Sequence, residues 1–272
     1  MKLTVLGSGT SQGVPVIGCS CPVCTSSDSR DKRMRCSLYI EGDAGERIVI
    51  DTGPEFRLQA LGAGITRLDA VFLTHAHADH IHGLDDIRPL SMDKTIPIYG
   101  NSLTIAEFRE RFSYVWRETQ KGGGKPHIEL IEVSGPVRLG RLTFTPIPVK
   151  HGKLDILGWK ISELPPSSVT PPVSALYLTD CSHIDNDVFT LIAKGGPPEI
   201  VIIGGLREKP HETHFSFEQA VNAAVRMGAG QIYLTHICHN NSHREIEKYC
   251  RDYAQKYGLS AVILPAWDGQ EL

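Results

Sequence analysis

The segment LTHAHADHIHG, residues 73–83, restricts the fold and chemistry of this chain more than any other. It begins at the end of the apolar run AVFLT, which predicts a β-strand. His75 and His77 alternate by two, so at a strand end their side chains can project to the same side. Asp79 and His80 then fall on a turn that leads into a helix. Imidazole and carboxylate groups in this setting predict a site for divalent metal ions.

Three further candidate ligands each follow an apolar run that predicts a strand. The runs are IPVKH, ALYLTD and QIYLTH, which place His151, Asp180 and His236 at strand ends. Any one of these residues alone would more often be structural. Together with the first segment they form a set large enough to hold two metal ions: His75, His77, Asp79, His80, His151, Asp180 and His236.

Composition limits the class of protein. The 272 residues carry a formal net charge of -3, which argues against tight nonspecific binding to nucleic acid. No apolar run approaches the roughly 20 residues that a membrane helix needs, and the apolar start is too short for a signal peptide. Seven cysteines, an odd number, favour thiols or metal ligands over disulfides. We therefore expect a soluble cytoplasmic protein without membrane contact or a stable nucleic-acid complex.

The pattern of the whole chain predicts an α/β fold in one domain, residues 1–272. Short strands alternate with stretches of helical spacing at 103–116, 216–227 and 243–257. Strands that feed helices fit an α/β sandwich better than an all-β barrel. Two segments, 120–126 and 163–172, are rich in Gly or in Pro and Ser, and we expect them to be mobile.

The run THAHADH resembles the His-x-His-x-Asp-His signature of the metallo-β-lactamase superfamily, and the order of the later ligands is similar to that of its other motifs. The resemblance spans most of the chain and implies a four-layer αββα sandwich with two divalent ions, Zn or Mn, along one sheet edge. It also implies the division of the ligands: His75, His77 and His151 for one ion, Asp79, His80 and His236 for the other, and Asp180 bridging both.

Residues within these motifs separate branches of the superfamily. His80 argues against true β-lactamases and His77 against flavodiiron proteins, because those branches usually carry other residues there. The segments GSGTSQGVP, CSCPVC, HGKLDILGWKI and KPHETHFSFEQAV resemble the cyclic phosphodiesterases of the carbon–phosphorus lyase pathway. This resemblance implies hydrolysis of a small cyclic phosphate or nucleotide phosphodiester. Relatives often form dimers, so a homodimer is also an expectation.

Two residues are candidates for catalytic work beyond metal binding. By the same resemblance, Asp79 orients the attacking water, and His214 protonates the leaving oxygen or stabilises the phosphorane. General acid help of this kind is typically worth roughly 10²–10⁴ in rate. His211 is a weaker candidate. Asp51 and Asp268 are either partners of ligand imidazoles or simple turn residues.

The run CSCPVC supplies three thiols, and structural zinc sites close with four donors. Candidates for the fourth are Cys36, Cys238, His239 and His243. We favour His239, which lies three residues after His236 and can face away from the catalytic ligands. The phosphodiesterase family implies the same arrangement. The predicted structural zinc site is Cys19, Cys21, Cys24 and His239.

Two alternative functions remain open at this stage. A tRNA 3′-processing-type endonuclease would use the same ligands but usually grips RNA with a long basic arm, which nothing in this sequence resembles. A non-catalytic nucleotide-binding or metal-sensing module could keep the fold without turnover. The intact ligand set argues against the second alternative.

Overall fold

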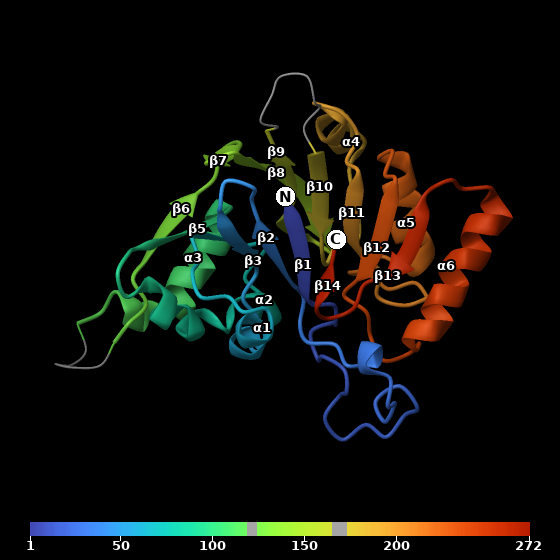
Figure 1. Ribbon diagram of the computed structural model, residues 1–272, viewed down its shortest axis with the longest axis horizontal. Coiled ribbons are helices and arrows are strands. Elements are labelled where there is room, and N and C mark those ends of the chain that lie inside the picture. Colours follow the sequence, from blue (N-terminus) through green and yellow to red (C-terminus); the bar gives the residue numbers. More distant parts are fainter. Residues whose placement is uncertain (119–123, 165–172) are drawn as a thin grey trace.

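The computed structural model describes residues 1–118, 124–164 and 173–272, and in that part of the chain two β-sheets lie face to face (Figure 1). The first sheet has the strand order β14-β1-β2-β3-β4-β5-β6, with β1 Lys2–Gly7, β2 Ser37–Glu41, β3 Arg47–Ile50, β4 Ala70–Phe72, β5 Ile96–Gly100, β6 Ile128–Glu132 and β14 Gln270–Glu271. The second has the order β13-β12-β11-β10-β9-β8-β7, with β7 Val137–Leu139, β8 Leu142–His151, β9 Leu154–Glu163, β10 Val173–Leu178, β11 Ile200–Gly204, β12 Gln231–Thr235 and β13 Val262–Pro265.

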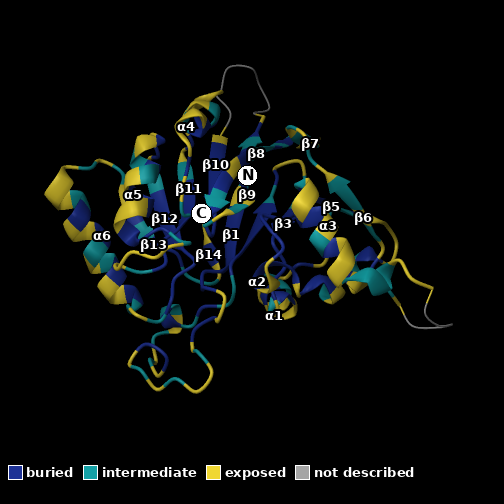
Figure 2. Ribbon diagram, turned by 180° about the vertical axis from the view of Figure 1, so that it is seen from behind, coloured by how far each residue is buried: buried dark blue, intermediate teal, exposed yellow. Residues whose placement is uncertain are grey.

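Helices cover the outer face of each sheet, which gives four layers. The bounds are α1 Phe56–Gly62, α2 Ala78–Ile81, α3 Ser102–Arg111, α4 Asn186–Ala193, α5 Phe217–Arg226 and α6 His243–Tyr257. Short 3₁₀ helices span Ser29–Asp31, Leu84–Ser91 and Ser113–Val115. Helices α1 to α3 pack on the first sheet, and α4 to α6 pack on the second. Figure 2 shows the buried strands between helices whose outer faces are exposed. The αββα sandwich expected from the sequence is therefore confirmed.

The two sheets are joined by a shared apolar core. Phe72 of β4 and Phe144 of β8 stack with ring centroids 4.0 Å apart. The indole N–H of Trp159 on β9 donates to the carbonyl oxygen of Leu73 at 3.2 Å, and the N–H of Leu157 donates to Thr74 O at 3.0 Å. These bonds fix the end of β4 against the second sheet, at the point where the histidine-rich segment begins.

Local sequence explains where the two longest C-terminal helices start and stop. Ser216 and Gln219 form a capping box at α5, and Ser242 and Glu245 form one at α6. Gly258 ends α6 with a φ of 62°, a conformation that glycine adopts at little cost. The predicted helix 243–257 matches α6 in both bounds.

Other expectations were met less closely. The helix expected at 103–116 ends at Arg111, because Phe112 leaves helical geometry (φ -103°, ψ 31°) and the chain tightens into a 3₁₀ turn. The long strand β9 was not predicted as a strand of its own, and α1 and α4 were missed. Most of the two segments expected to be mobile lies outside the described residues. In the described part of the chain, no helix is both long and apolar enough to cross a membrane.

Strand direction brings the candidate ligands to one edge of the sandwich. Strands β8 and β10 are both antiparallel to β9, and β10, β11 and β12 are parallel to one another. The carboxyl ends of β8, β10 and β12 therefore lie at the same edge of the second sheet. His151 is the last residue of β8, and Asp180 and His236 lie just after the ends of β10 and β12.

Candidate metal centre

The structure gathers the seven predicted ligands into two groups that share one carboxylate. In each group the candidate ligand atoms lie within 4.8 Å of one another. One group is His75, His77, His151 and Asp180; the other is Asp79, His80, Asp180 and His236. This is the division that the family resemblance implied, and Asp180 is the residue common to both. Metal binding itself stays a prediction.

The distances between candidate ligand atoms suit two metal ions that share the carboxylate of Asp180. In the first group, His75 Nε2 lies 2.9 Å from His77 Nδ1 and 3.7 Å from Asp180 Oδ2. In the second, Asp180 Oδ1 lies 3.0 Å from His236 Nε2, and Asp180 Oδ2 lies 3.4 Å from His80 Nε2. The two oxygens of one carboxylate thus face both groups.

Neighbouring groups orient the imidazoles through their other nitrogen. Asp51 Oδ2 lies 2.7 Å from His80 Nδ1, and the N–H and hydroxyl of Thr74 both donate to Asp51 at 2.8 Å. His151 Nδ1 lies 2.7 Å from the carbonyl oxygen of Thr213. These contacts leave the Nε2 atoms of His80 and His151 facing the site. Partners of this kind on the other ring nitrogen are usual in histidine–metal centres.

Close backbone packing brings Asp51 to the histidine segment. The N–H of Thr52 donates to His80 O at 2.7 Å, and the N–H of Gly83 donates to Thr52 O at 2.8 Å. A Cβ atom at Gly83 would lie 2.1 Å from the carbonyl oxygen of Gly53. Glycine at position 83 is therefore required for this approach.

Backbone conformation marks the same edge. In the described residues, Asp51, Asp180 and His236 are the non-glycine residues with positive φ, at 61°, 58° and 56°. This left-handed conformation is uncommon for residues with a side chain and costs of order 1 kcal/mol or more. All three lie just past the end of a strand, and all three are in the site or hold it. The strain is consistent with a functional role.

The donor set fits divalent ions. Asp79 and Asp180 are buried, and their ion pairs among the described residues are with histidines rather than with Lys or Arg. Buried carboxylates need a cationic partner. The Nε2 atoms of His80 and His236 are buried and have no hydrogen-bond partner in the described part of the chain. Metal ions between these atoms would satisfy both requirements.

Electrostatics favour the protonation states that metal binding needs at two of the ligands, His75 and Asp180. Burial lowers the pKa of His75 well below its ordinary value, so its imidazole is neutral. Burial by itself would raise the pKa of Asp180, but His236 and His80 hold it well below the usual range. A neutral imidazole and an ionised carboxylate are the forms that coordinate metals.

His214 lies beside both ligand groups without belonging to either. Its ring centroid is 4.6 Å from that of His151 and 4.8 Å from that of His236, with the second pair stacked at 19°. Burial, and then the neighbouring His236, lower the pKa of His214 to about 3. His211 lies farther out, 5.2 Å from His214. The position of His214 fits the role predicted for it, which stays a prediction.

The three thiols and His239 form a second cluster. The sulfur atoms of Cys19, Cys21 and Cys24 lie 3.4, 3.5 and 3.4 Å from His239 Nδ1. Zinc bonds of about 2.3 Å to sulfur and 2.0 Å to nitrogen place tetrahedral neighbours about 3.5 Å apart. The backbone N–H of Cys24 donates to Cys21 Sγ and lowers the pKa of that thiol to about 6. Of the four candidates for the last ligand, the structure places His239 against the thiols.

The cluster lies on a long irregular loop that is otherwise held by polar contacts. Arg30 pairs with Asp28 and with Glu247 of α6, and Asp31 accepts from the N–H of His243 at 2.7 Å. The apolar contacts of the loop are few, centred on Val14, Val23 and Cys24. A zinc ion bound to the three thiols and His239 would cross-link this loop to the segment that carries His236.

We expect Cys21→Ser to remove one zinc ion per chain and to lower the melting temperature by roughly 5–10 °C, given about 2–4 °C per kcal/mol in a chain of this size. Cys238→Ser is the matched control, because Cys238 is adjacent to His239 but its thiol donates to Asn240 instead. Elemental analysis and thermal unfolding of both variants measure the effect. A Cys21→Ser protein with its full zinc content and melting temperature would exclude this site.

The structure assigns different roles to Asp51 and Asp268, for which the sequence allowed the same two interpretations. Asp51 is the partner of a ligand imidazole, as one of its two interpretations held. Asp268 instead accepts from the N–H and hydroxyl of Ser8 and from the N–H of Met34, and so holds the loop after β1. The sequence analysis missed Thr213 altogether, because a backbone carbonyl leaves no signal in a side-chain pattern. Thr74 could have been suspected from its place directly before His75.

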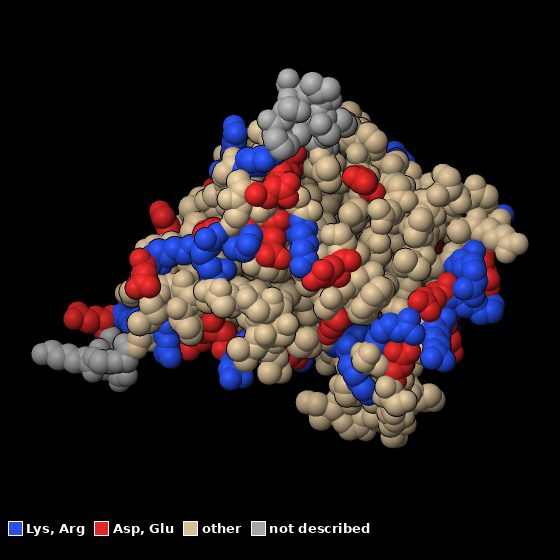
Figure 3. Space-filling model, in the orientation of Figure 1, with Lys and Arg blue, Asp and Glu red and all other residues tan. Residues whose placement is uncertain are grey.

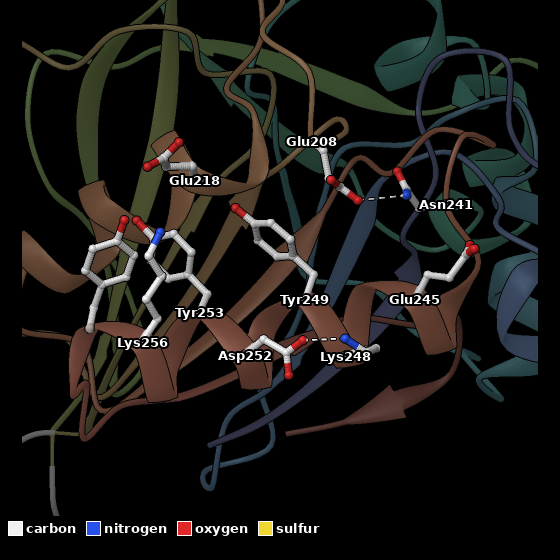
Figure 4. Close-up of a pocket in the computed structure, with 10 residues that line it drawn as sticks. Glu208, Glu218, Asn241, Glu245, Lys248, Tyr249, Asp252, Tyr253 and Lys256 are labelled. Atoms are coloured by element: carbon white, nitrogen blue, oxygen red, sulfur yellow. Dashed lines mark hydrogen bonds and ion pairs between the residues drawn. The ribbon is translucent and has the colours of Figure 1, made fainter.

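A wide groove on the described surface lies away from the metal-site residues. It measures about 550 Å³ and runs along α6, lined by Tyr249, Tyr253 and Tyr257 with acidic residues and two lysines (Figure 4). Lys248 pairs there with Asp252 at 2.6 Å. The groove contains none of the metal-site residues, so we assign it no part in the chemistry.

Comparison with known proteins identifies the family. A family model described as a beta-lactamase superfamily domain matches residues 46–237. The chain belongs to this superfamily. Members of the beta-lactamase superfamily are generally hydrolases.

Among curated proteins, an octanoyltransferase of Porphyromonas gingivalis is 40% identical over 243 residues, covering 88% of this chain and 46% of that protein. A coenzyme PQQ synthesis protein B of Methylobacterium nodulans is 31% identical over 101 residues, covering 32% of this chain and 34% of that protein. The chain thus spans less than half the length of these two relatives.

Solved structures place the chain more closely within the beta-lactamase superfamily. A diphosphatase of the PhnP family superposes with a TM-score of 0.83 and 38% identity, over 100% of this chain and 96% of that one. The chain is therefore PhnP-like, as the sequence indicated. Zn²⁺-bound PqqB of Methylobacterium extorquens superposes with a TM-score of 0.78 over 100% of this chain and 99% of that one. Its identity is 17%, so this likeness concerns the fold alone.

Proposed function

We propose that this chain is a metal-dependent phosphodiesterase that hydrolyses a small cyclic phosphate or nucleotide phosphodiester. The observation that carries the proposal is the pair of four-residue ligand groups joined by the carboxylate of Asp180. Donors of this kind suit Zn or Mn. A single shared carboxylate between two such groups is the arrangement that two-metal hydrolases use.

When bound, two such ions would lower the pKa of a water molecule and neutralise charge on phosphoryl oxygens. The chain's own residues supply the rest. The carboxylate of Asp79, 3.2 Å from His80 Nε2, is placed to accept a hydrogen bond from the attacking water. His214 is stacked on His236, where its ring can donate to the leaving oxygen or to a phosphoryl oxygen. Because the protein around Asp79 and His214 is largely buried, both of these hydrogen bonds would be stronger than in water.

Likeness to the PhnP-family diphosphatase supports phosphate-ester chemistry, since that protein covers the whole chain at 38% identity. The relative named an octanoyltransferase matches over less than half its length, so its name carries no activity to this chain. We propose a cytoplasmic location, a small phosphodiester or nucleotide substrate, and no stable complex with nucleic acid or a membrane. A homodimer is part of the same proposal.

The alternative of a tRNA 3′-processing endonuclease has weaker support. Human tRNase Z, short form, superposes with a TM-score of 0.68 at 17% identity, which concerns the fold alone. On the face shown in Figure 3, Lys and Arg side chains are interspersed with Asp and Glu. The net charge of -3 adds little attraction for RNA. The small-substrate reading is therefore favoured.

The test is hydrolysis by metal-reconstituted protein of three substrates: bis(p-nitrophenyl) phosphate, a 2′,3′-cyclic nucleotide and precursor tRNA. We expect turnover of the first two and not of the third, and loss of turnover after chelation. Cleavage of precursor tRNA alone, with binding that falls steeply with salt, would support the endonuclease instead. Metal binding without turnover of any substrate would support a non-catalytic module.

A further inference from the structure

Three of the strands that carry candidate ligands end in the same two residues, a leucine and a threonine. The triplets are Leu73-Thr74-His75, Leu178-Thr179-Asp180 and Leu234-Thr235-His236. Each leucine and each threonine is fully buried. A buried hydroxyl group needs a hydrogen-bond partner, and the partner differs among the three threonines.

Two of these hydroxyls have a single partner each. The hydroxyl of Thr179 donates to Oδ1 of the neighbouring Asp180 at 2.8 Å. The hydroxyl of Thr235 lies 3.3 Å from Cys36 Sγ. Neither of these contacts joins a ligand to a residue outside the ligand groups.

The hydroxyl of Thr74 joins a carboxylate to a ligand imidazole. Its oxygen lies 2.8 Å from Asp51 Oδ2 and 3.0 Å from His75 Nδ1. The backbone N–H of Thr74 donates to the other carboxylate oxygen, Asp51 Oδ1, at 2.8 Å. All three residues are buried, so protein groups rather than bulk water decide where the protons lie.

The proton positions follow from what each group can accept. An ionised carboxylate only accepts, so the hydroxyl of Thr74 donates its one proton to Asp51. The hydroxyl oxygen is then the acceptor for His75, whose Nδ1 carries the hydrogen. His75 Nε2 is left unprotonated, 2.9 Å from His77 Nδ1 and 3.7 Å from Asp180 Oδ2. A neutral ring of this form can bind a metal through Nε2.

The carboxylate of Asp51 also meets a ligand of the other group directly. Asp51 Oδ2 lies 2.7 Å from His80 Nδ1. His75 belongs to the first ligand group and His80 to the second. Burial raises the pKa of Asp51, whereas His80 and both donors of Thr74 act in the opposite direction and favour the ionised form. One buried carboxylate is thus linked to an imidazole in each group, directly in one case and through a hydroxyl in the other.

We propose that Thr74 is a positioning residue whose hydroxyl extends the hold of Asp51 to His75, so that one carboxylate orients a ligand in both metal groups. This inference rests on the proposed two-metal function and adds a residue that takes no part in coordination. Loss of the hydroxyl should weaken the ion of the first group. The second group should be spared, because Asp51 reaches His80 without Thr74.

The test measures the two active-site affinities for Zn²⁺ by competition with a chelator, with the thiol cluster kept saturated. We expect Thr74→Val, which keeps the size of the side chain and loses the hydroxyl, to weaken one of the two ions by roughly 10–100-fold. Thr74→Ser should keep both affinities, because serine retains the hydroxyl. Asp51→Asn should weaken both ions, since an amide offers one acceptor oxygen in place of two.

Thr235→Val is the matched control. Thr235 also directly precedes a ligand, His236, but its hydroxyl lies against a thiol rather than a carboxylate, so both affinities should stay unchanged. NMR of imidazole N–H groups in the Zn²⁺-loaded protein reports the proposed hydrogen bond itself. One Nδ1–H should exchange with water faster in Thr74→Val than in the wild-type chain and Thr74→Ser. Melting temperatures report that each variant is folded.

Four results would overturn the role of Thr74. Unchanged affinities and N–H exchange in Thr74→Val would remove its hydroxyl from positioning, and a loss shared by Thr74→Ser would assign the effect to packing. Equal weakening of both ions in Thr74→Val would place the effect at Asp51 instead of His75. Weakening of one ion alone in Asp51→Asn would show that the carboxylate does not act on both groups. Failure of the proposed function is separate, because it would appear as absent hydrolysis by protein that binds both ions.

Discussion

Asp180→Asn is expected to abolish hydrolysis, lowering kcat/KM by at least roughly 10³-fold, and to reduce the content of active-site metal. Asp180 is the residue that both ligand groups share, with Oδ2 3.7 Å from His75 Nε2 of the first group and Oδ1 3.0 Å from His236 Nε2 of the second. An amide cannot supply the negative charge that a carboxylate gives to two cations. Metal analysis and steady-state kinetics on bis(p-nitrophenyl) phosphate measure the two effects.

Asparagine is the informative replacement because position 180 has a φ of 58°. Asparagine tolerates this left-handed conformation far better than alanine, so the variant removes the charge without adding backbone strain. Asp187→Asn is the control, since Asp187 is exposed on α4. An Asp180→Asn protein that keeps both ions and full activity would disprove the shared-carboxylate assignment.

His214→Ala should lower turnover by roughly 10²–10⁴ and leave the active-site metals in place. His214 lies beside His151 and stacks on His236 but is not in either ligand group, so its loss removes a proton donor without removing a ligand. In the free protein, burial and then His236 hold its pKa at about 3, which keeps the ring neutral. A bound phosphate anion would favour the protonated form.

The leaving group decides which role His214 has. If it protonates the leaving oxygen, the loss in His214→Ala shrinks for acidic leaving groups such as p-nitrophenol and is largest for a sugar alkoxide. An equal loss for every leaving group would indicate that the ring stabilises phosphoryl charge instead. Unchanged turnover with all substrates would take His214 out of the mechanism. His211→Ala, farther from the ligand groups, is the control.

The fold and most of the site could be predicted because their signals are local. Runs such as QIYLTH predict both a buried strand and the polar residue that follows it. Because neighbouring strands are parallel, their carboxyl ends lie at one edge of the sheet. The division of the ligands needed the family resemblance, since spacing along the chain does not show which imidazoles face which carboxylate oxygen. The same holds for His239, which was favoured over three other candidates by its place after His236 and by the resemblance, and which the structure places against the thiols.

What the sequence did not show depends on contacts between distant segments. Thr213 holds His151 through a backbone carbonyl 62 positions away, and Trp159 crosses to Leu73 between sheets. The choice between the two interpretations of Asp268 also needed the structure, because its bonds to Ser8 and Met34 depend on how the chain end returns to β1.

The most direct test of a two-metal phosphodiesterase is a titration with Zn²⁺ or Mn²⁺ of protein stripped of its active-site metal, with turnover of bis(p-nitrophenyl) phosphate measured at each step. The structural cluster is saturated with zinc beforehand, so that added ions report on the shared-carboxylate site alone. We expect activity to rise until two equivalents per chain are bound and then to level off. A protein that binds two further ions and hydrolyses neither this diester nor a cyclic nucleotide would contradict the account.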